Sequence, residues 1–277
     1  KTLVSTSIYV NKIIEKNVNE YICICGEYST SSSGANNGAD AKLITVSASN
    51  GNIVSQTSCF GYQAFNWLDD VESAIEIKNN FMFSTGRIYL QNLPAKMRSN
   101  LIKYDSNGNL KWAKYLHKNS AGTSRMYSRD LIYYSPSKLL LAYMCDDNCT
   151  GGCTDYFPGL MLIDTSGTVI WDKTYNIPAS NAEFVDRAII MGNSIYLTGF
   201  TNANSSSGCD ALVLKTDLSG NVQACKSYGP TTNEKPFFNH VANASDTKNG
   251  LLYFTTSSEA SNGFYNISVL KVDSTLS

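Results

Sequence analysis

Short hydrophobic runs recur along the chain, and most of them end in glycine or another small residue. Five such runs end near residues 26, 86, 142, 199 and 256, at intervals of 56 to 60 residues. Hydrophobic and polar positions alternate with a period of two, and Tyr, Ile and Val are frequent, which is typical of β-strands. Because no segment keeps the 3.6-residue period of a helix, the pattern predicts an all-β protein built from repeats.

Each repeat contains a second hydrophobic run that is closed by an acidic residue and a glycine turn. The complete copies are Leu101–Asn109, Met161–Thr168 and Leu212–Asn221; a truncated copy ends at Ser274, and a diverged copy covers Leu43–Asn52. A third run follows each turn, and a fourth precedes the first run, as in Val71–Ile77 and Val185–Ile190. Tight turns join antiparallel neighbours, so each repeat predicts a meander of four strands.

Four antiparallel strands repeated with one period predict a five-bladed β-propeller. We expect a single domain, residues 1–277, with blades at about 10–61, 62–118, 119–176 and 177–229 and a last blade made of 230–277 plus 1–9. The last repeat stops before its outermost strand, whereas the chain begins with a spare strand-like segment. We therefore expect about Thr2–Ser5 to pair alongside the last strand and close the ring. A β-solenoid has shorter coils, and a pair of sandwiches would not keep one period.

The segment Asp210–Gly229, DALVLKTDLSGNVQACKSYG, resembles the repeats of secreted β-propeller proteins, whose pattern runs D-x-Φ-x-Φ-K-x-D-x-x-G-N-x-x-W-x-K-x-Y-G with Φ apolar. Ala224 stands at the Trp position, which is Trp112 and Trp171 in the second and third repeats. The resemblance spans essentially the whole chain and implies a propeller scaffold. It carries no catalytic residue across, because proteins with such repeats have many functions.

Charge and hydropathy limit the partners. Lys and Arg number 22 against 23 Asp and Glu, and only 16% of residues are charged, so no basic field is available to bind nucleic acid. The longest apolar run, Leu139–Met144, is too short to cross a membrane. No signal-like segment begins at Lys1. We expect a mature secreted chain, extracellular or at the cell surface, without membrane insertion.

Most acidic residues recur with the repeat, which indicates a structural role. Asp105, Asp164, Asp217 and Asp273 occupy the same turn, where a carboxylate accepts hydrogen bonds from backbone N–H groups. Asp40 and Asp210 both open a third strand.

The innermost strands align to give a ring of polar residues at one mouth of the predicted channel. Its members are Asn11/Lys12, Glu72/Ser73, Arg129/Asp130, Asp186/Arg187 and Asn239/His240. This ring would bind a small polar ligand or simply balance its own charges. A hydrolase needs two acids with separated pKa values, and Glu72 and Asp186 are the one pair that the ring offers.

Neither a metal nor another cofactor is predicted. The two histidines, His117 and His240, do not have ligand spacing, and the loop Asp146–Asp155 opens like a calcium loop but has Phe157 where the bidentate acid should stand. A calcium site of irregular geometry remains an alternative for this loop.

The cysteines divide into two groups. Cys145, Cys149, Cys153 and Cys209 fall on predicted neighbouring loops and form either two disulfides or a zinc site; their spacing favours disulfides in an oxidising compartment. Cys23, Cys25, Cys59 and Cys225 are expected to be buried thiols. Asn148 and Asn204 are glycosylation candidates on predicted exposed loops, although chance alone accounts for the number of such motifs.

Long loops gather on one predicted face, which is therefore the expected working face. The aromatic binding candidates on it are Tyr62, Phe65, Trp67, Tyr156, Phe157, Phe237 and Phe238. We predict a non-catalytic extracellular module, not an enzyme, that binds copies of itself or other extracellular proteins through this face. The alternatives are a lectin-like propeller with glycan ligands and a glycosidase-like hydrolase. Against the lectin, its sugar pocket usually repeats in every blade, and these loops diverge.

Overall fold

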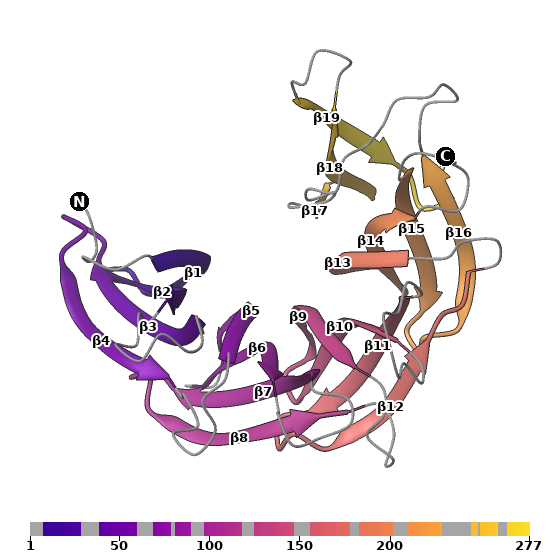
Figure 1. The fold of residues 1–277 in the computed structure, drawn as a ribbon. Helices are drawn as coiled ribbons and strands as arrows, with labels where there is room; N and C mark the ends of the chain where they lie inside the picture. Colours follow the sequence, from indigo (N-terminus) through magenta and orange to yellow (C-terminus); the bar gives the residue numbers. More distant parts are fainter. Residues whose placement is uncertain are drawn as a thin grey trace. The chain divides into compact units, whose positions relative to one another are not determined.

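The computed structural model describes residues 8–28, 39–59, 69–78, 81–89, 97–117, 125–146, 156–177, 183–201, 210–228, 245–248, 250–259 and 265–277. These residues form nineteen β-strands, and none of them belongs to a helix (Figure 1). Accordingly, the described segments include no helix of the length and hydrophobicity needed to cross a membrane. The all-β prediction is confirmed for this part of the chain.

The strands form five sheets in which neighbours follow chain order. The first sheet contains β1 (Ile8–Asn17), β2 (Glu20–Tyr28), β3 (Ala39–Ser47) and β4 (Ile53–Cys59). The second contains β5 (Asp69–Lys78), β6 (Phe81–Tyr89), β7 (Met97–Asp105) and β8 (Leu110–Leu116). The third contains β9 (Met126–Ser135), β10 (Lys138–Cys145), β11 (Phe157–Asp164) and β12 (Val169–Thr174).

The fourth sheet contains β13 (Glu183–Met191), β14 (Ser194–Thr201), β15 (Asp210–Asp217) and β16 (Val222–Tyr228). The fifth contains β17 (Ser245–Lys248), β18 (Leu251–Glu259) and β19 (Tyr265–Val272), without a fourth strand among the described residues. The pairings within the first two sheets and the fourth are all antiparallel, as the repeat predicts. Four of the five predicted meanders are thus present as four-stranded sheets.

The chain divides into two compact units. One comprises Lys1–Pro136 with Asn148–Thr150, and the other comprises Ser137–Asp147 with Gly151–Ser277. The predicted single domain, the blade boundaries and the closed ring stay predictions. Thr2–Ser5, the expected closing segment, lies outside the described residues.

The turn between the third and fourth strands repeats the same hydrogen bonds from sheet to sheet. Asp105 Oδ1 accepts the backbone N–H groups of Asn107 and Asn109, at 3.0 and 2.9 Å. Asp164 and Asp217 accept the equivalent groups two and four residues later, at 2.8 to 2.9 Å. The predicted role of these carboxylates is therefore confirmed.

The same turn needs one residue in the left-handed backbone region, three positions after the acid. Gly108, Gly167 and Gly220 have φ angles of 84°, 82° and 77° there. In the fifth sheet Leu276 takes this position with a φ of 65°, although a side chain disfavours it. Leu276 is only 2% exposed, so burial of its side chain offsets the strain.

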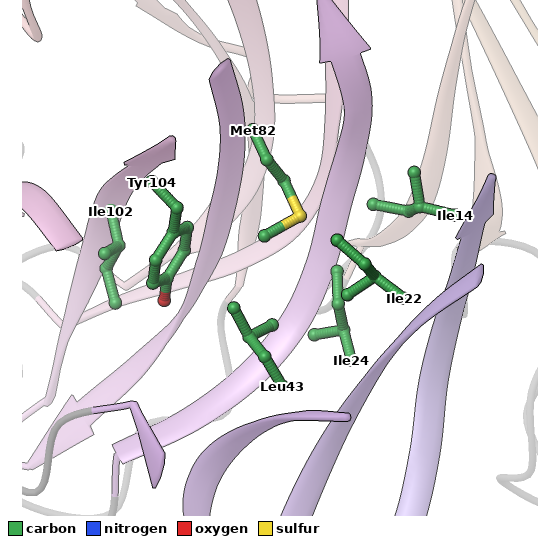
Figure 2. Packing of buried hydrophobic residues seen from close by; sticks show 7 residues of the cluster. All are labelled: Ile14, Ile22, Ile24, Leu43, Met82, Ile102 and Tyr104. Carbon is green, nitrogen blue, oxygen red and sulfur yellow. The ribbon is translucent and has the colours of Figure 1, made fainter. Parts of the chain in front are cut away.

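The first unit has a hydrophobic core between its first two sheets, shown in Figure 2. It contains Ile14, Ile22, Ile24, Leu43, Met82, Ile102 and Tyr104. Ile22 and Ile24 are two residues apart on β2 and so point to one face of the sheet. Cys23 and Cys25 on the other face of β2 are buried as well and pack with Ile44, so this strand is covered on both faces.

The second unit has an equivalent hydrophobic core between the fourth and fifth sheets of the chain. It contains Tyr196, Phe200, Ala211, Val213, Leu252, Val272 and Leu276. Two tyrosines of this unit also bond to the turn of the following sheet: Tyr175 OH donates to the carbonyl of Gly220 at 3.0 Å, and Tyr228 OH donates to that of Leu276 at 2.7 Å. Burial and the charge of Asp273 raise the pKa of Tyr228 to about 12, so its hydroxyl stays a donor.

Lysines two residues before these tyrosines reach the same turns. Lys173 Nζ lies 2.6 Å from Asn221 Oδ1, and Lys226 Nζ lies 2.9 Å from the Leu276 carbonyl. The K-x-Y part of the repeat therefore ties one sheet to the next within this unit.

Candidate functional site

A β-bulge recurs on the first strand of three sheets. The pairing shifts between Val10 and Lys12 on β1, between Val71 and Ser73 on β5, and between Val185 and Arg187 on β13. The extra residues are Asn11, Glu72 and Asp186. In each sheet the residue after the bulge pairs with the fifth residue of the next strand: Ile24, Thr85 and Thr198.

These are the positions that the sequence alignment matched as a polar ring. A bulge bends the strand and re-aims a side chain, and bulges are frequent next to active sites. The recurrence indicates that the three positions are structurally equivalent within their own sheets. The ring itself stays a prediction, since the side chains of Lys12 and Glu72 and all of His240 lie outside the described part of the molecule.

In the third sheet, the predicted ring residues Arg129 and Asp130 lie on β9. Asp130 is 3% exposed and its Oδ1 accepts the backbone N–H of Leu131 at 3.0 Å. The neighbouring Ser128 donates its hydroxyl to the Gly86 carbonyl of β6 at 2.7 Å. Asp130 is therefore buried within the first unit, and its predicted place in a ring stays a prediction.

The second unit gathers aromatic rings at the start of β13. The ring of Tyr156 lies 5.2 Å from that of Phe184, and Phe184 stacks on Phe200 at 4.3 Å with an angle of 14°. The backbone N–H of Glu183 donates to the Tyr156 carbonyl at 3.1 Å, which fixes Tyr156 beside the strand. Phe200 is buried, whereas Tyr156 and Phe184 are half-buried.

The bulge on β13 brings an arginine to the same sheet face as this stack. Phe184 pairs with Phe200, and Arg187 pairs with Thr198. Phe200 and Thr198 are two residues apart, so they point to one face, and their partners share it. Without the extra residue, positions 184 and 187 would point to opposite faces. Thr198 is 1% exposed, and its hydroxyl has no hydrogen-bond partner among the described residues.

The sheet also carries carboxylates on its other face. Glu183 and Asp210 flank Thr201 in one row across β13, β14 and β15, and this row points away from Phe200 and Arg187. Asp186 precedes Arg187, and Arg187 Nη1 donates to the Asp186 carbonyl at 3.4 Å. The arrangement combines hydroxyl, carboxylate and guanidinium groups with aromatic rings, which is the composition of a site for a small polar ligand.

Of the predicted aromatic candidates, Tyr156 joins this cluster and Phe157 does not lie in a loop. Phe157 is the first residue of β11 and pairs with Cys145. The other candidates lie outside the described residues: Tyr62, Phe65, Trp67, Phe237 and Phe238.

Neither Phe184 nor Thr198 was among the predicted site residues. The adjacent polar residues Asp186 and Arg187 mark the bulge in the sequence, since the register shifts between Val185 and Arg187. Phe200 is the second aromatic of the stack, and only the pairing of β13 with β14 joins it to Phe184.

Cys23 and Cys25 are buried, as predicted, but Cys225 is exposed. The prediction for Cys225 was wrong because β16 is the outermost strand of its sheet, where alternate side chains face solvent. Cys145 is buried at the end of β10. Cys149, Cys153, Cys209, Asn148 and Asn204 lie outside the described residues, so the disulfide and glycosylation predictions stay predictions. Within the described segments, no three His, Cys, Asp or Glu residues are placed to hold a metal ion.

No protein-family model matches the sequence, and no curated protein is significantly similar to it. Solved structures do share its fold. The sialidase of Trypanosoma rangeli in complex with sialic acid superposes with a TM-score of 0.58 and 12% identity, covering 98% of this chain and 48% of the sialidase. The polysaccharide lyase Uly1 gives 0.51 and 11%, covering 94% and 56%. A levansucrase mutant of B. megaterium gives 0.50 and 8%, covering 97% and 82%.

The chain therefore has a β-propeller-type fold, and it spans about half the length of the sialidase and lyase chains. At such identities the similarity carries the fold alone. The three structures are nevertheless of carbohydrate-active enzymes, which contradicts the prediction of a non-catalytic interaction module and favours the carbohydrate-binding alternative. They also weaken the prediction that the chain is not an enzyme. The prediction was wrong because it was based on the balanced charge and on the acids that recur in every repeat. Both are properties of the scaffold and do not indicate function.

Proposed function

We propose that the chain binds carbohydrate at the bulge of β13. The observation that carries this proposal is the cluster in which the Tyr156 ring lies against Phe184, with Asp186 and Arg187 in the same strand. Sugars offer an apolar C–H face to an aromatic ring and hydroxyl groups to charged or amide side chains. The fold shared with a sialidase, a polysaccharide lyase and a levansucrase supports the proposal.

A glycan array probed with the purified full chain tests carbohydrate binding. We expect binding to a related subset of glycans, with a dissociation constant in the micromolar to millimolar range that calorimetry then measures. Heat-denatured protein serves as the control. If the native protein retains no glycan that the denatured protein does not also retain, the proposal is wrong.

Glycoside hydrolysis is a second candidate, favoured by the bulge of β13, whose extra residue is the acid Asp186. Glycosidases use carboxyl groups for their chemistry, and Asp186 would be one of them. Reducing-sugar release from the glycans bound on the array tests this candidate, and Asp186→Asn should abolish it. Release that persists in the folded variant would refute the assignment.

We also propose a ring of five blades that is closed by Thr2–Ser5 alongside β19. Apolar residues on both terminal sheets support closure. Ile13 on β1 is 62% exposed on the face opposite to the buried Ile14, and Val269 on β19 is 66% exposed next to Leu270, which packs on the core. Deletion of residues 1–7 should then accelerate amide hydrogen exchange in β19. Unchanged exchange there would contradict closure.

An extracellular location with two disulfides among Cys145, Cys149, Cys153 and Cys209 completes the proposal. Its support is the spacing of these cysteines and the low content of charged residues, 16%.

A further inference from the structure

We infer that two copies of the chain associate through β4, the outermost strand of the first sheet, by antiparallel pairing of one β4 with the β4 of the other copy. The inference is independent of the proposed carbohydrate binding, because β4 belongs to the first unit and β13 to the second. Three properties of β4 support it: an edge position, a lack of charged residues, and exposed apolar residues.

β4 ends its sheet, so one of its sides has no neighbouring strand among the described residues (Figure 1). The backbone N–H and C=O groups of such an edge are a template for a further strand. In the next three sheets the corresponding outermost strands are β8, β12 and β16. All four strands have a bulge at their second residue: Val54, Lys111, Ile170 and Gln223. Neither the edge position nor the bulge therefore distinguishes β4 from the other three.

Charge does distinguish β4. Its seven residues, IVSQTSC, include no charged residue, whereas the other three strands contain Lys111 and Lys114, Asp172 and Lys173, and Lys226. When two copies of one strand pair about a two-fold axis, residues near the middle of the strand face their own copies, and like charges that face one another are destabilising. Charged side chains also keep edge strands from pairing. Among these four outermost strands, only β4 is without this protection.

The exposed residues of β4 suit a second β4 as the partner. Ile53 and Val54 are 42% and 55% exposed, and the following Ser55 and Gln56 are exposed as well. A charged peptide would form no ion pair with this strand, whereas a second copy offers the same neutral and β-branched residues, which favour pairing in sheets. Pairing over one short strand buries less than the roughly 1,200 Å² typical of stable interfaces, so we expect weak association, with a dissociation constant of about 10 μM to 1 mM.

Analytical ultracentrifugation of the full chain, from about 5 μM to about 1 mM, tests the association. Reducing conditions prevent a disulfide through Cys59, the last residue of β4. We expect the average mass to rise toward that of a dimer with concentration. Amide hydrogen exchange in β4 should slow over the same range, whereas exchange in β8 should not change. A chain that stays monomeric throughout, or that associates without slower exchange in β4, would overturn the inference and leave carbohydrate binding unaffected.

Matched variants assign the association to this edge. Gln56 and Ala113 are both exposed, and each is the fourth residue of its strand, β4 or β8. Gln56→Lys places two lysines near one another in the paired strands and should weaken dimerisation at least about tenfold, whereas Ala113→Lys should leave it unchanged. Ser55→Lys is a second variant with the same expected effect as Gln56→Lys. Circular dichroism and thermal melting establish that each variant is folded. Dimerisation of folded Gln56→Lys and Ser55→Lys as strong as that of the wild type, or its loss in Ala113→Lys, would refute the assignment to β4.

Discussion

Replacement of Gly199 by alanine should destabilise the protein more than the same change at Gly192 in the same hairpin. Gly199 lies on β14 opposite Val185, directly at the bulge. A Cβ atom placed on it would lie 1.9 Å from the carbonyl oxygen of Phe184 and 2.8 Å from the Cα atom of Val185. Both obstacles are backbone atoms, so no side chain can rotate away to relieve the clash.

The expected loss in free energy of unfolding follows from these distances. Real Cβ contacts are essentially never below 3.0 Å, so β13 and β14 must separate by about 1 Å at the bulge. Over-packing of this kind costs typically 1–3 kcal/mol and occasionally more, and a rigid backbone obstacle places Gly199→Ala at about 3 kcal/mol. Gly192 has a φ of 60° and nothing within 4 Å of its Cβ position. Gly192→Ala therefore meets only the left-handed backbone penalty, about 1–2 kcal/mol.

Urea denaturation followed by fluorescence measures both free energies of unfolding under the same conditions. Folded Gly199→Ala should also lose glycan binding, because separation of the strands displaces Phe184 and Arg187, whereas Gly192→Ala should retain it. A Gly199→Ala variant that is as stable as Gly192→Ala would refute the close approach of the strands at the bulge.

Three further predictions concern other parts of the molecule. Tyr228→Phe removes the donor to the Leu276 carbonyl and should lower the free energy of unfolding by about 1 kcal/mol in urea denaturation, with an unchanged value counting against the contact. The backbone N–H of Asn221 chiefly lowers the pKa of Asp217, so this carboxylate stabilises the fold above its unfolded pKa of about 4; that stabilisation should be lost as pH falls toward the lower folded pKa. Melting curves of the wild type and Asp217→Asn should therefore converge in acid, and a constant difference would contradict the linkage. Non-reducing peptide mapping should find Cys145, Cys149, Cys153 and Cys209 oxidised, with reduction costing about 2–4 kcal/mol, and four free thiols would refute the oxidising compartment.

Local chemistry made the repeat predictable. The acid of each turn accepts hydrogen bonds from the residues two and four positions later, so a short sequence pattern contains these interactions. The alignment of Asn11, Glu72 and Asp186 likewise matched residues that the bulges make equivalent, because each lies eight or nine residues before the next strand begins.

Features that depend on distant strands were not predictable. Phe184 acquires its role from Phe200, sixteen positions later, through pairing across a bulge that breaks the period of two. Cys225 has the pattern of a strand interior, and its exposure follows from the place of β16 at the edge of its sheet. Function could not be predicted from the repeat, because the residues that recur in every repeat build a scaffold that proteins with different activities share.

The tyrosine that joins one sheet to the next donates its hydrogen bond to a backbone carbonyl, so the contact does not depend on the side chain of the accepting residue. Tyr175 and Tyr228 make the same bond to residues as different as Gly220 and Leu276. A contact of this kind survives substitution of the accepting residue, so a duplicated repeat can drift in sequence at the turn and still join its neighbour. Because this hydrogen bond does not depend on the accepting side chain, each repeat can change its sequence and its loops separately. The contact between neighbouring sheets is kept.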